Sequence, residues 1–152
     1  MASTREARGS IILKIIIVML IAVLVYVIYE PYQIRAQEES YQTESRSRMV
    51  NIRAAQLLFI GQHGRYVSTL DSLVLFIEDL SDSVRSAAFT PLSGGPFRAQ
   101  SLLRAPKSNR AYVLVCIDSV AIQKYFLQDP DGYGSIGSLT DDARVNKASW
   151  EE

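Results

Sequence analysis

The chain has 152 residues, of which 48% are hydrophobic and 21% charged, and its 16 basic and 16 acidic side chains give a formal net charge of zero. Without a basic surplus the sequence argues against a nucleic-acid-binding protein. The single cysteine, Cys116, excludes an intramolecular disulfide, and its place in the apolar run 112–117 predicts that it packs as a small hydrophobic residue.

An apolar run of nineteen residues, Ile11–Tyr29, lies near the N-terminus and contains one charged residue, Lys14, and no proline or glycine. As a helix it would be about 28 Å long, close to the ~30 Å hydrocarbon core of a bilayer. A removable secretory signal is the competing interpretation, but its apolar region is usually shorter and followed by small residues. We therefore expect an uncleaved transmembrane helix over residues 11–30, in contact with membrane lipid.

The charges on either side of this run predict its orientation. Arg5 and Arg8 precede it, whereas the residues beyond it begin with Glu30 and carry mixed charge. Because positive charge remains on the cytoplasmic side, residues 1–10 should form a cytoplasmic tail, and the C-terminal domain should lie outside the cytoplasm. The tyrosines near the outer end have the spacing of an interfacial aromatic belt: Tyr26, Tyr29 and Tyr32.

A stalk helix is predicted over residues 31–63. Pro31 removes an amide donor and clashes with the preceding turn, so a kink or short break is expected at Glu30-Pro31. The first half, residues 33–48, is polar all round, as in a helix that is solvent-exposed or pairs with neighbours in an assembly. The second half carries an apolar stripe that should pack onto the globular domain: Met49, Ile52, Ala55 and Phe59, broadened by Val50, Ala54, Leu57 and Leu58.

Residues 64–152 should form a small α+β domain, which begins with a helix end and a new helix. Gly64 can supply the left-handed residue that ends the long helix. Ser68 or Thr69 can cap a short second helix, with Asp71 in its first turn. The apolar side of that helix should consist of Leu70, Leu73, Val74 and Ile77.

Strands are predicted further along the chain. A strand near Phe97–Arg104, a turn over residues 106–109 and a strand Ala111–Ile117 would make a β-hairpin. Val120–Leu127 is predicted as a third strand, although residues 121–126 would also tolerate a helical turn. The resulting small antiparallel sheet would cover the amphipathic half of the long helix. Trp150, the lone tryptophan, should hold the C-terminal tail on the domain.

One group of acidic residues could carry metal chemistry. Asp129 and Asp131 lie in the sequence Asp-Pro-Asp-Gly, which begins like an oxygen-ligand calcium loop but lacks the continuation and closing glutamate of an EF-hand. Other carboxylates lie in the same part of the chain: Asp118, Asp141 and Asp142. The motif is also good turn chemistry, so a structural turn is the alternative. Calcium is the one cofactor that the sequence suggests.

The sequence does not predict an enzyme. No Ser-His-Asp or Cys-His arrangement has the context that nucleophilic catalysis needs, and no phosphate-binding glycine loop follows a strand. His63, the single histidine, has no cysteine, histidine or carboxylate cluster around it in the sequence. We therefore interpret His63 as structural.

Several motifs together resemble type IV pilins and type II secretion pseudopilins. The features concerned are the hydrophobic N-terminal helix, the proline about twenty residues into it, the motif Gly64-Arg65-Tyr66, and Arg8-Gly9-Ser10, which is similar to a prepilin-peptidase site. The resemblance implies a pilin-like α+β fold, anchored in a bacterial inner membrane with a periplasmic domain. It also extends to residues 129–139, which are loosely similar to the calcium-holding loop of major pseudopilins. The HGRY, LDSL and DGY motifs are similar, in addition, to a group of uncharacterised single-span envelope proteins of Bacteroidetes.

One residue departs from the pilin pattern. Pilins usually carry a glutamate at the fifth position of the processed helix, and counted from Ser10 this position is Lys14. An ammonium cannot neutralise a neighbour's N-terminal amine, so filament packing of the usual kind is not implied. Our leading hypothesis is a structural subunit or accessory of a cell-envelope assembly, which associates with itself or other envelope proteins through the helix. The alternative is a monomeric tethered periplasmic domain that binds a ligand or calcium.

Overall fold

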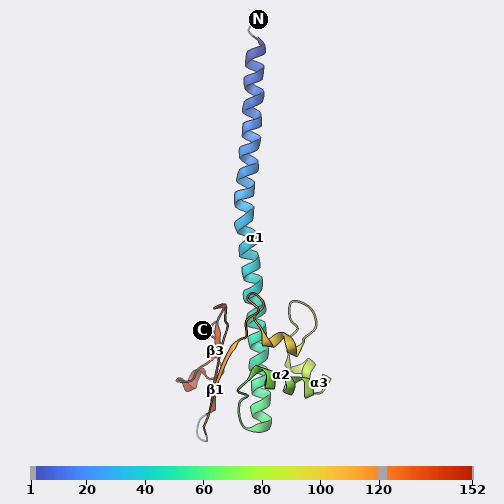
Figure 1. Ribbon diagram of the computed structural model, residues 1–152, viewed down its shortest axis with the longest axis vertical. Coiled ribbons are helices and arrows are strands. Elements are labelled where there is room, and N and C mark those ends of the chain that lie inside the picture. Colours follow the sequence, from blue (N-terminus) through green and yellow to red (C-terminus); the bar gives the residue numbers. More distant parts are fainter. Residues whose placement is uncertain (1–2, 120–122, 152) are drawn as a thin grey trace. The chain divides into compact units, whose positions relative to one another are not determined.

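The computed structural model describes residues 3–119 and 123–151, with side chains from residue 11 onward. The helices are α1 (Ser3–His63), α2 (Leu70–Asp79), α3 (Asp82–Ala88) and the 3₁₀ helices η1 (Ala99–Leu103) and η2 (Asp142–Arg144); the strands are β1 (Val113–Asp118), β2 (Gln123–Gln128) and β3 (Ser135–Gly137) (Figure 1). The strands form an antiparallel sheet in the order β1-β2-β3. One long apolar N-terminal helix and a small antiparallel sheet agree with the predicted α+β class.

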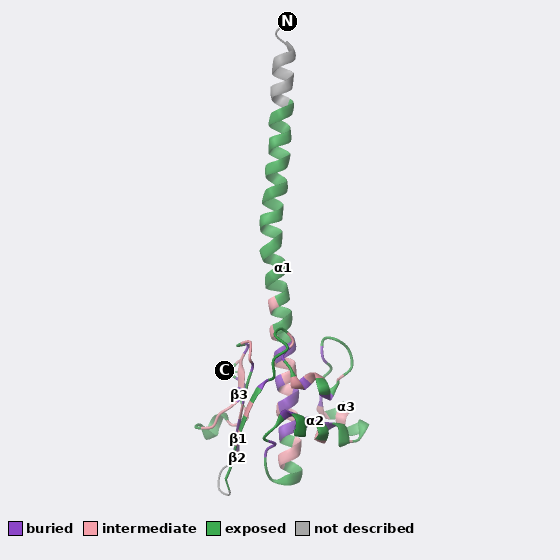
Figure 2. Ribbon diagram, in the orientation of Figure 1, coloured by how far each residue is buried: buried purple, intermediate pink, exposed green. Residues whose placement is uncertain are grey.

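The chain divides into two compact units, residues 1–40 and 41–152, and we call the second unit the head. In the first unit every residue from 11 to 37 is exposed (Figure 2). By length and composition, α1 is the one helix of the described chain that could cross a membrane. The predicted helical state of the apolar run is therefore confirmed, and the third of α1 that begins at Tyr41 belongs to the head.

Pro31 does not interrupt α1. The helix continues on both sides of this residue, so the predicted break at Glu30-Pro31 is wrong. A proline removes only its own N–H donor and one helical hydrogen bond, and the bonds of the adjoining turns continue the helix. Residues 3–10, predicted as a tail, are also helical, whereas residues 1–2 and the side chains of Arg8-Gly9-Ser10 lie outside the described part.

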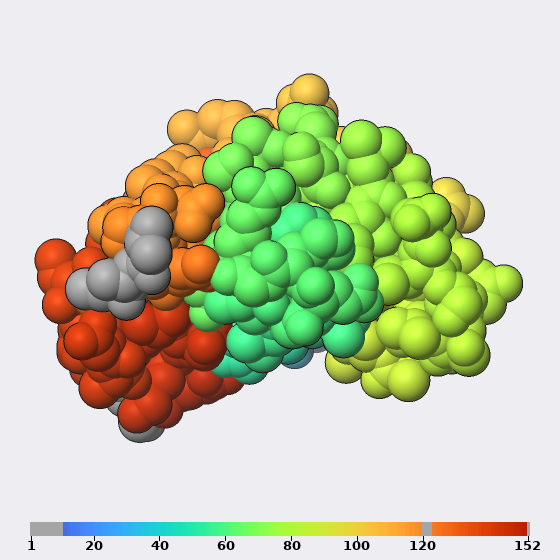
Figure 3. Space-filling model, turned by 90° about the horizontal axis from the view of Figure 1, so that it is seen from below, coloured from blue at the N-terminus to red at the C-terminus, as the bar shows by residue number. Residues whose placement is uncertain are grey.

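The hydrophobic core of the head forms on α1. Met49, Ile52 and Ala55 are fully buried, which confirms the predicted stripe, although Leu57 is exposed. These residues share one cluster with side chains from α2, η1 and the sheet: Leu73, Ile77, Leu102, Tyr125, Leu127 and Ile136. In an end-on view of the head, the last turns of α1 (cyan-green) lie between the α2–α3 segment (yellow-green) and the sheet with the C-terminal residues (orange and red) (Figure 3).

The joint between α1 and α2 follows the local sequence signals. Gly64 has φ +71°, and its N–H donates to the Ile60 carbonyl at 2.8 Å, so it ends α1 as predicted. Thr69 is the N-cap of α2, and its Oγ1 accepts a hydrogen bond from the Ser72 N–H at 3.4 Å. The buried residues of α2 are the four that were predicted: Leu70, Leu73, Val74 and Ile77.

The predicted strand Phe97–Arg104 is wrong, because this segment contains η1. Ala99 and Leu102 are both buried, and a separation of three residues matches the period of a 3₁₀ helix rather than that of a strand. The turn over residues 106–109 is confirmed, since the Ala105 N–H donates to the Arg110 carbonyl at 2.8 Å. The Ala111–Ile117 prediction corresponds to β1.

Two further strands complete the sheet. The predicted Val120–Leu127 strand corresponds to β2 over Gln123–Gln128, and its first three residues lie outside the described part of the chain. β3, in the glycine-rich tail, was not predicted. The Arg46 guanidinium lies 5.0 Å from the centroid of the Trp150 ring, and Trp150 packs against the core, so this aromatic holds the tail as expected.

Cys116 is half-buried against the core, and its thiol donates to the Val67 carbonyl at 3.0 Å, as predicted for a packed residue. Burial, assisted by the Asp118 carboxylate, raises the pKa of the thiol to about 11. At pH 8 the thiolate fraction should be roughly a hundred-fold below that of an exposed cysteine. We expect Ellman's reagent to react with native Cys116 at least about tenfold more slowly than with an exposed thiol in a Leu75→Cys, Cys116→Ser variant. Equal rates for the two thiols would contradict the packing.

Candidate functional site

Polar side chains on the head part of α1 connect this helix to distant loops. We call these residues the polar network of α1: Glu44, Ser45, Arg48, Asn51 and Gln56. Glu44 and Ser45 are 8% and 0% exposed, and Asn51 and Gln56 are also buried. The prediction that residues 33–48 are solvent-exposed or paired with neighbouring chains is therefore wrong for its last turns. Loops that cross a helix carry unpaired backbone groups, and these side chains satisfy them.

Glu44 and Arg48 form one end of this network. The Arg48 Nε donates to Glu44 Oε1 at 3.0 Å, and its Nη1 donates to the Ser101 and Arg104 carbonyls at 3.0 and 2.7 Å. Glu44 Oε2 accepts the Ser93 N–H at 2.8 Å. Burial alone would raise the pKa of Glu44, but the bonds from Ser93 and Arg48 outweigh it and hold the pKa below its ordinary value.

Acid should therefore destabilise the head. Because the pKa of Glu44 in the folded state lies below its ordinary value of 4.5, the carboxylate stabilises the fold fully above about pH 4.5. This contribution is lost as the pH falls through the lower folded-state pKa. We expect Glu44→Gln to be less stable than wild type at pH 7, and this deficit should shrink as the pH falls below the ordinary carboxyl pKa of 4.5 and through the lower folded-state pKa. Thermal unfolding followed by Trp150 fluorescence measures it, with the exposed Glu39→Gln as control. A deficit that is constant with pH would contradict the role of the carboxylate.

The predicted calcium ligand Asp129 belongs to the same network. Asp129 is 2% exposed, and its Oδ2 accepts a hydrogen bond from the Ser45 hydroxyl, which also pairs with the Tyr112 hydroxyl at 2.8 Å. Its Oδ1 accepts the Asp131 N–H at 2.5 Å. Burial raises the pKa of the Tyr112 hydroxyl well above its ordinary value, so this group remains neutral. Asp129 thus joins α1 to the turn after β2.

The second predicted ligand, Asp131, has partners from the turn before β1. Its Oδ1 lies 3.2 Å from the Arg110 Nη2, and its Oδ2 accepts the Ser108 N–H at 3.2 Å. Burial alone would raise the pKa of Asp131, but the bonds from Ser108 and Arg110 lower it below the ordinary value.

The four carboxylate oxygens of Asp129 and Asp131 already accept hydrogen bonds from protein donors, an arrangement that suits a structural turn better than a calcium cage. The other predicted carboxylates lie apart from them: Asp142 pairs with Lys124, Asp141 caps η2, and Asp118 is exposed on β1. Within residues 3–119 and 123–151, no group of three histidine, cysteine or acidic residues is placed to hold a metal. Calcium binding by Asp129 and Asp131 stays a prediction.

The head contains a cavity that was not predicted. It is a cleft of about 780 Å³ between α3 and the segment 89–100. Phe89 and Phe97 are stacked on its wall with ring centroids 4.6 Å apart and planes 11° from parallel, and Pro91 and Pro96 also line it. The sequence signal was the run Phe-Thr-Pro-Leu-Ser-Gly-Gly-Pro-Phe, which indicated a loop but not a wall of aromatic rings.

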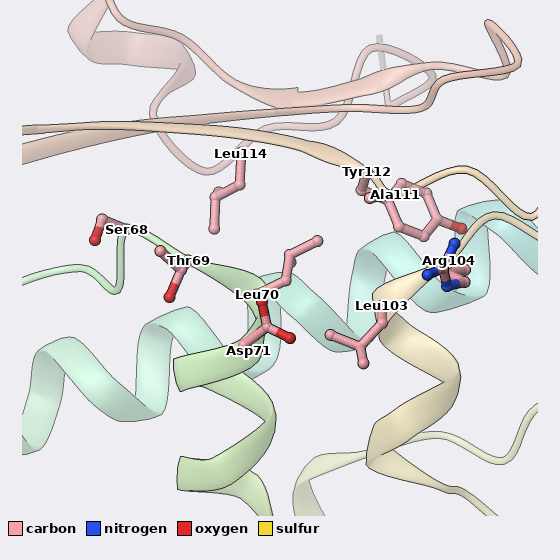
Figure 4. Close-up of a pocket in the computed structure, with 9 residues that line it drawn as sticks. All are labelled: Ser68, Thr69, Leu70, Asp71, Leu103, Arg104, Ala111, Tyr112 and Leu114. Atoms are coloured by element: carbon pink, nitrogen blue, oxygen red, sulfur yellow. The ribbon is translucent and has the colours of Figure 1, made fainter.

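A second groove, of about 310 Å³, lies between the start of α2, the end of η1 and β1. Leu114 points from β1 toward the start of α2, and Leu70 and Leu103 line the groove as well (Figure 4). Two of its polar side chains already have structural roles, since Thr69 caps α2 and Arg104 donates to the Asn109 carbonyl at 2.9 Å. This groove is therefore a weaker candidate for a ligand than the cleft.

His63 lies apart from both cavities. Its ring stacks on Phe59 with centroids 4.1 Å apart, and its Nδ1 lies 3.3 Å from the Phe59 carbonyl oxygen.

Comparison with protein-family models, with curated proteins and with solved structures gave no match to this chain. Its function must therefore be argued from its own residues.

Proposed function

We propose that this chain is a membrane-anchored structural subunit or accessory protein of a bacterial cell-envelope assembly, similar to pilins and pseudopilins, and not an enzyme. One observation carries the proposal: the large apolar side chains from Ile11 to Tyr29 are 47 to 68% exposed, whereas the head has a separate core of its own. Exposure of such an apolar surface to water is unfavourable. A lipid bilayer removes it from water, and the helix keeps all of its backbone hydrogen bonds there. With Arg5 and Arg8 on the cytoplasmic side, the head would be periplasmic and the anchor in the inner membrane.

Assembly with neighbouring chains should depend on the head more than on the anchor. The anchor is rich in isoleucine and valine, and Ala22 is its single small residue, so it has no pair of small residues for close helix packing in lipid and the span alone should associate weakly. In the head, β1 is an edge strand, and Val113, Val115 and Ile117 are 40 to 48% exposed on it. An unprotected apolar edge strand is a common surface for contact with another chain.

Membrane extraction tests the anchor. The full chain should remain in the membrane pellet after an alkaline carbonate wash. Added protease should cleave the head in spheroplasts, but not in sealed inside-out membrane vesicles, where a periplasmic head is enclosed. A variant with Leu20→Arg and Val23→Arg places two charges near the centre of the span, at about 2.5–3.5 kcal/mol each, and should lose membrane insertion. A wild-type chain that is freely soluble after gentle lysis, or a head that is protected inside the cell, would overturn the proposal.

Intact mass from membranes distinguishes the processing alternatives. Loss of residues 1–9 would establish prepilin-type cleavage after Gly9, and the full-length mass would indicate an unprocessed anchor. Loss of the whole apolar run would instead identify a secretory signal and contradict the anchor. Crosslinking in cells, followed by blue-native gels, tests assembly, and a monomer without crosslinked partners would count against it.

A second candidate function is a monomeric tethered domain that binds a ligand or calcium. The cleft of about 780 Å³ favours it, because its volume lies in the range of small-molecule sites. For calcium, the full chain should unfold at a higher temperature when calcium chloride is added, and Asp131→Ala should abolish this shift. A shift that Asp131→Ala leaves intact would exclude the Asp129–Asp131 site.

A further inference from the structure

The wall of the cleft is held in place from α1. The Thr90 N–H and hydroxyl both donate to Asn51 Oδ1 at 3.0 Å, and the Asn51 amide donates back to the Thr90 carbonyl at 3.0 Å. Three residues further on, the Ser93 N–H is bound by Glu44. Two buried side chains of a long helix therefore fix the segment that carries Phe89 and Pro91. A preformed wall lowers the ordering cost of binding.

Planar apolar groups line the interior of the cleft. Phe89 is 4% exposed and supports Phe97, which is half-buried and presents its ring at the cavity. Pro91 and Pro96 lie on either side of a tight turn, in which the Gly95 N–H donates to the Leu92 carbonyl at 3.0 Å. Rings and prolines are rigid surfaces on which another flat ring can stack with little loss of entropy.

The charges around the cleft are not all neutralised within the chain. Arg85 pairs with Asp82, and the Glu78 carboxylate accepts a hydrogen bond from the Gln100 amide at 2.8 Å. Arg98 lines the same cleft next to Phe97, is exposed, and has no carboxylate partner among residues 11–119 and 123–151. A guanidinium beside an aromatic wall is suited to a carboxylate on an aromatic ligand.

We infer that the cleft is a binding site for a small aromatic carboxylate, whose ring stacks on Phe97 and whose carboxylate pairs with Arg98. The inference names a ligand class for the second candidate function and is compatible with the first, because the site lies in the head and does not involve the anchor. Binding is non-covalent and requires no cofactor.

The test uses two probes that share the same ring, the anionic 2-naphthoate and the neutral 2-naphthamide, with the full-length chain in lipid nanodiscs. Saturation-transfer NMR titrations should give saturable binding of naphthoate that is absent from empty nanodiscs. Naphthamide should bind about tenfold more weakly, because it lacks the charge-assisted bond to Arg98. Arg98→Gln should weaken naphthoate binding about tenfold and remove the preference for naphthoate over naphthamide.

Variants of the wall provide the remaining controls. Phe97→Ala should reduce binding of both probes at least about tenfold, whereas Leu75→Ala and Arg104→Gln, which alter exposed side chains outside the cleft, should leave both unchanged. Thermal unfolding of each variant shows that the head remains folded. Unaltered naphthoate binding in either Arg98→Gln or Phe97→Ala, or equal binding of the two probes to wild type, would overturn the inference. Blue-native gels test assembly in a separate experiment. Ligand binding in the cleft and the structural role can therefore be contradicted independently of each other.

Discussion

Gly137→Ala should unfold or severely destabilise the head, because position 137 has no room for a side chain. Gly137 has φ +86°, and a Cβ at this residue would lie 2.3 Å from the Tyr125 carbonyl oxygen and 3.0 Å from that of Val145. Both neighbours are backbone atoms and cannot rotate away. Left-handed strain contributes about 1–2 kcal/mol and the overpacked contact about 1–3 kcal/mol, so we expect a loss of roughly 2–5 kcal/mol.

A loss of this size should lower the midpoint of thermal unfolding by at least about 10 °C in a domain of this length. Trp150 fluorescence measures it in the full chain, because the single tryptophan packs against the core of the head. The matched control is Gly61→Ala, where a Cβ has nothing within 4 Å and the backbone is helical, so this change should be neutral or slightly stabilising. A Gly137→Ala midpoint within a few degrees of wild type would show that the tail does not pack on β2 in this way.

Elements specified by neighbouring residues could be predicted from the sequence. The apolar run, the end of α1 at Gly64 and the cap of α2 at Thr69 each depend on a few adjacent residues, and the structure agrees with all three. The stripe on α1 was also recoverable, because helical periodicity identifies the buried face before its partners are known. Local signals were misleading at Pro31, where a single breaker does not outweigh the helical turns on both sides.

Features that depend on distant residues could not be predicted. Glu44 contacts Ser93, and Asn51 contacts Thr90, at separations of 49 and 39 residues. A polar helix face is compatible with solvent exposure or with binding a loop, and the composition of residues 33–48 does not distinguish the two. The cleft could not be predicted for the same reason, because its wall is a loop that Glu44 and Asn51 hold in place from a distant part of the sequence. For Asp129 and Asp131 the sequence suggested a calcium loop or a structural turn, and it could not identify their hydrogen-bond donors Ser45, Ser108 and Arg110, which lie elsewhere in the chain.

Gln56→Leu is the second substitution for which we expect a large effect, because Gln56 completes a buried backbone pairing. The Gln56 Nε2 donates to the Val67 carbonyl at 2.8 Å, and its Oε1 accepts the Val67 N–H at 2.9 Å. Gln56 is 0% and Val67 5% exposed, so water cannot replace these bonds. Leucine has a similar volume but leaves the N–H unpaired, while the carbonyl keeps only the Cys116 thiol. We expect a loss of about 2–4 kcal/mol.

Gln56→Glu separates the two bonds. A carboxylate still accepts the Val67 N–H but cannot donate to the carbonyl, and its burial should raise its pKa, so that protonation on acidification restores the donor. Relative to wild type at the same pH, Gln56→Glu should therefore be less destabilised at pH 4.5 than at pH 8, whereas Gln56→Leu should show the same deficit at both. Gln62→Leu changes an exposed glutamine six residues further along the same helix and should have almost no effect on the unfolding midpoint. If Gln56→Leu and Gln62→Leu have the same unfolding midpoint, the segment around Val67 is not held by α1. The joint between α1 and α2 must then be stabilised by its apolar contacts alone.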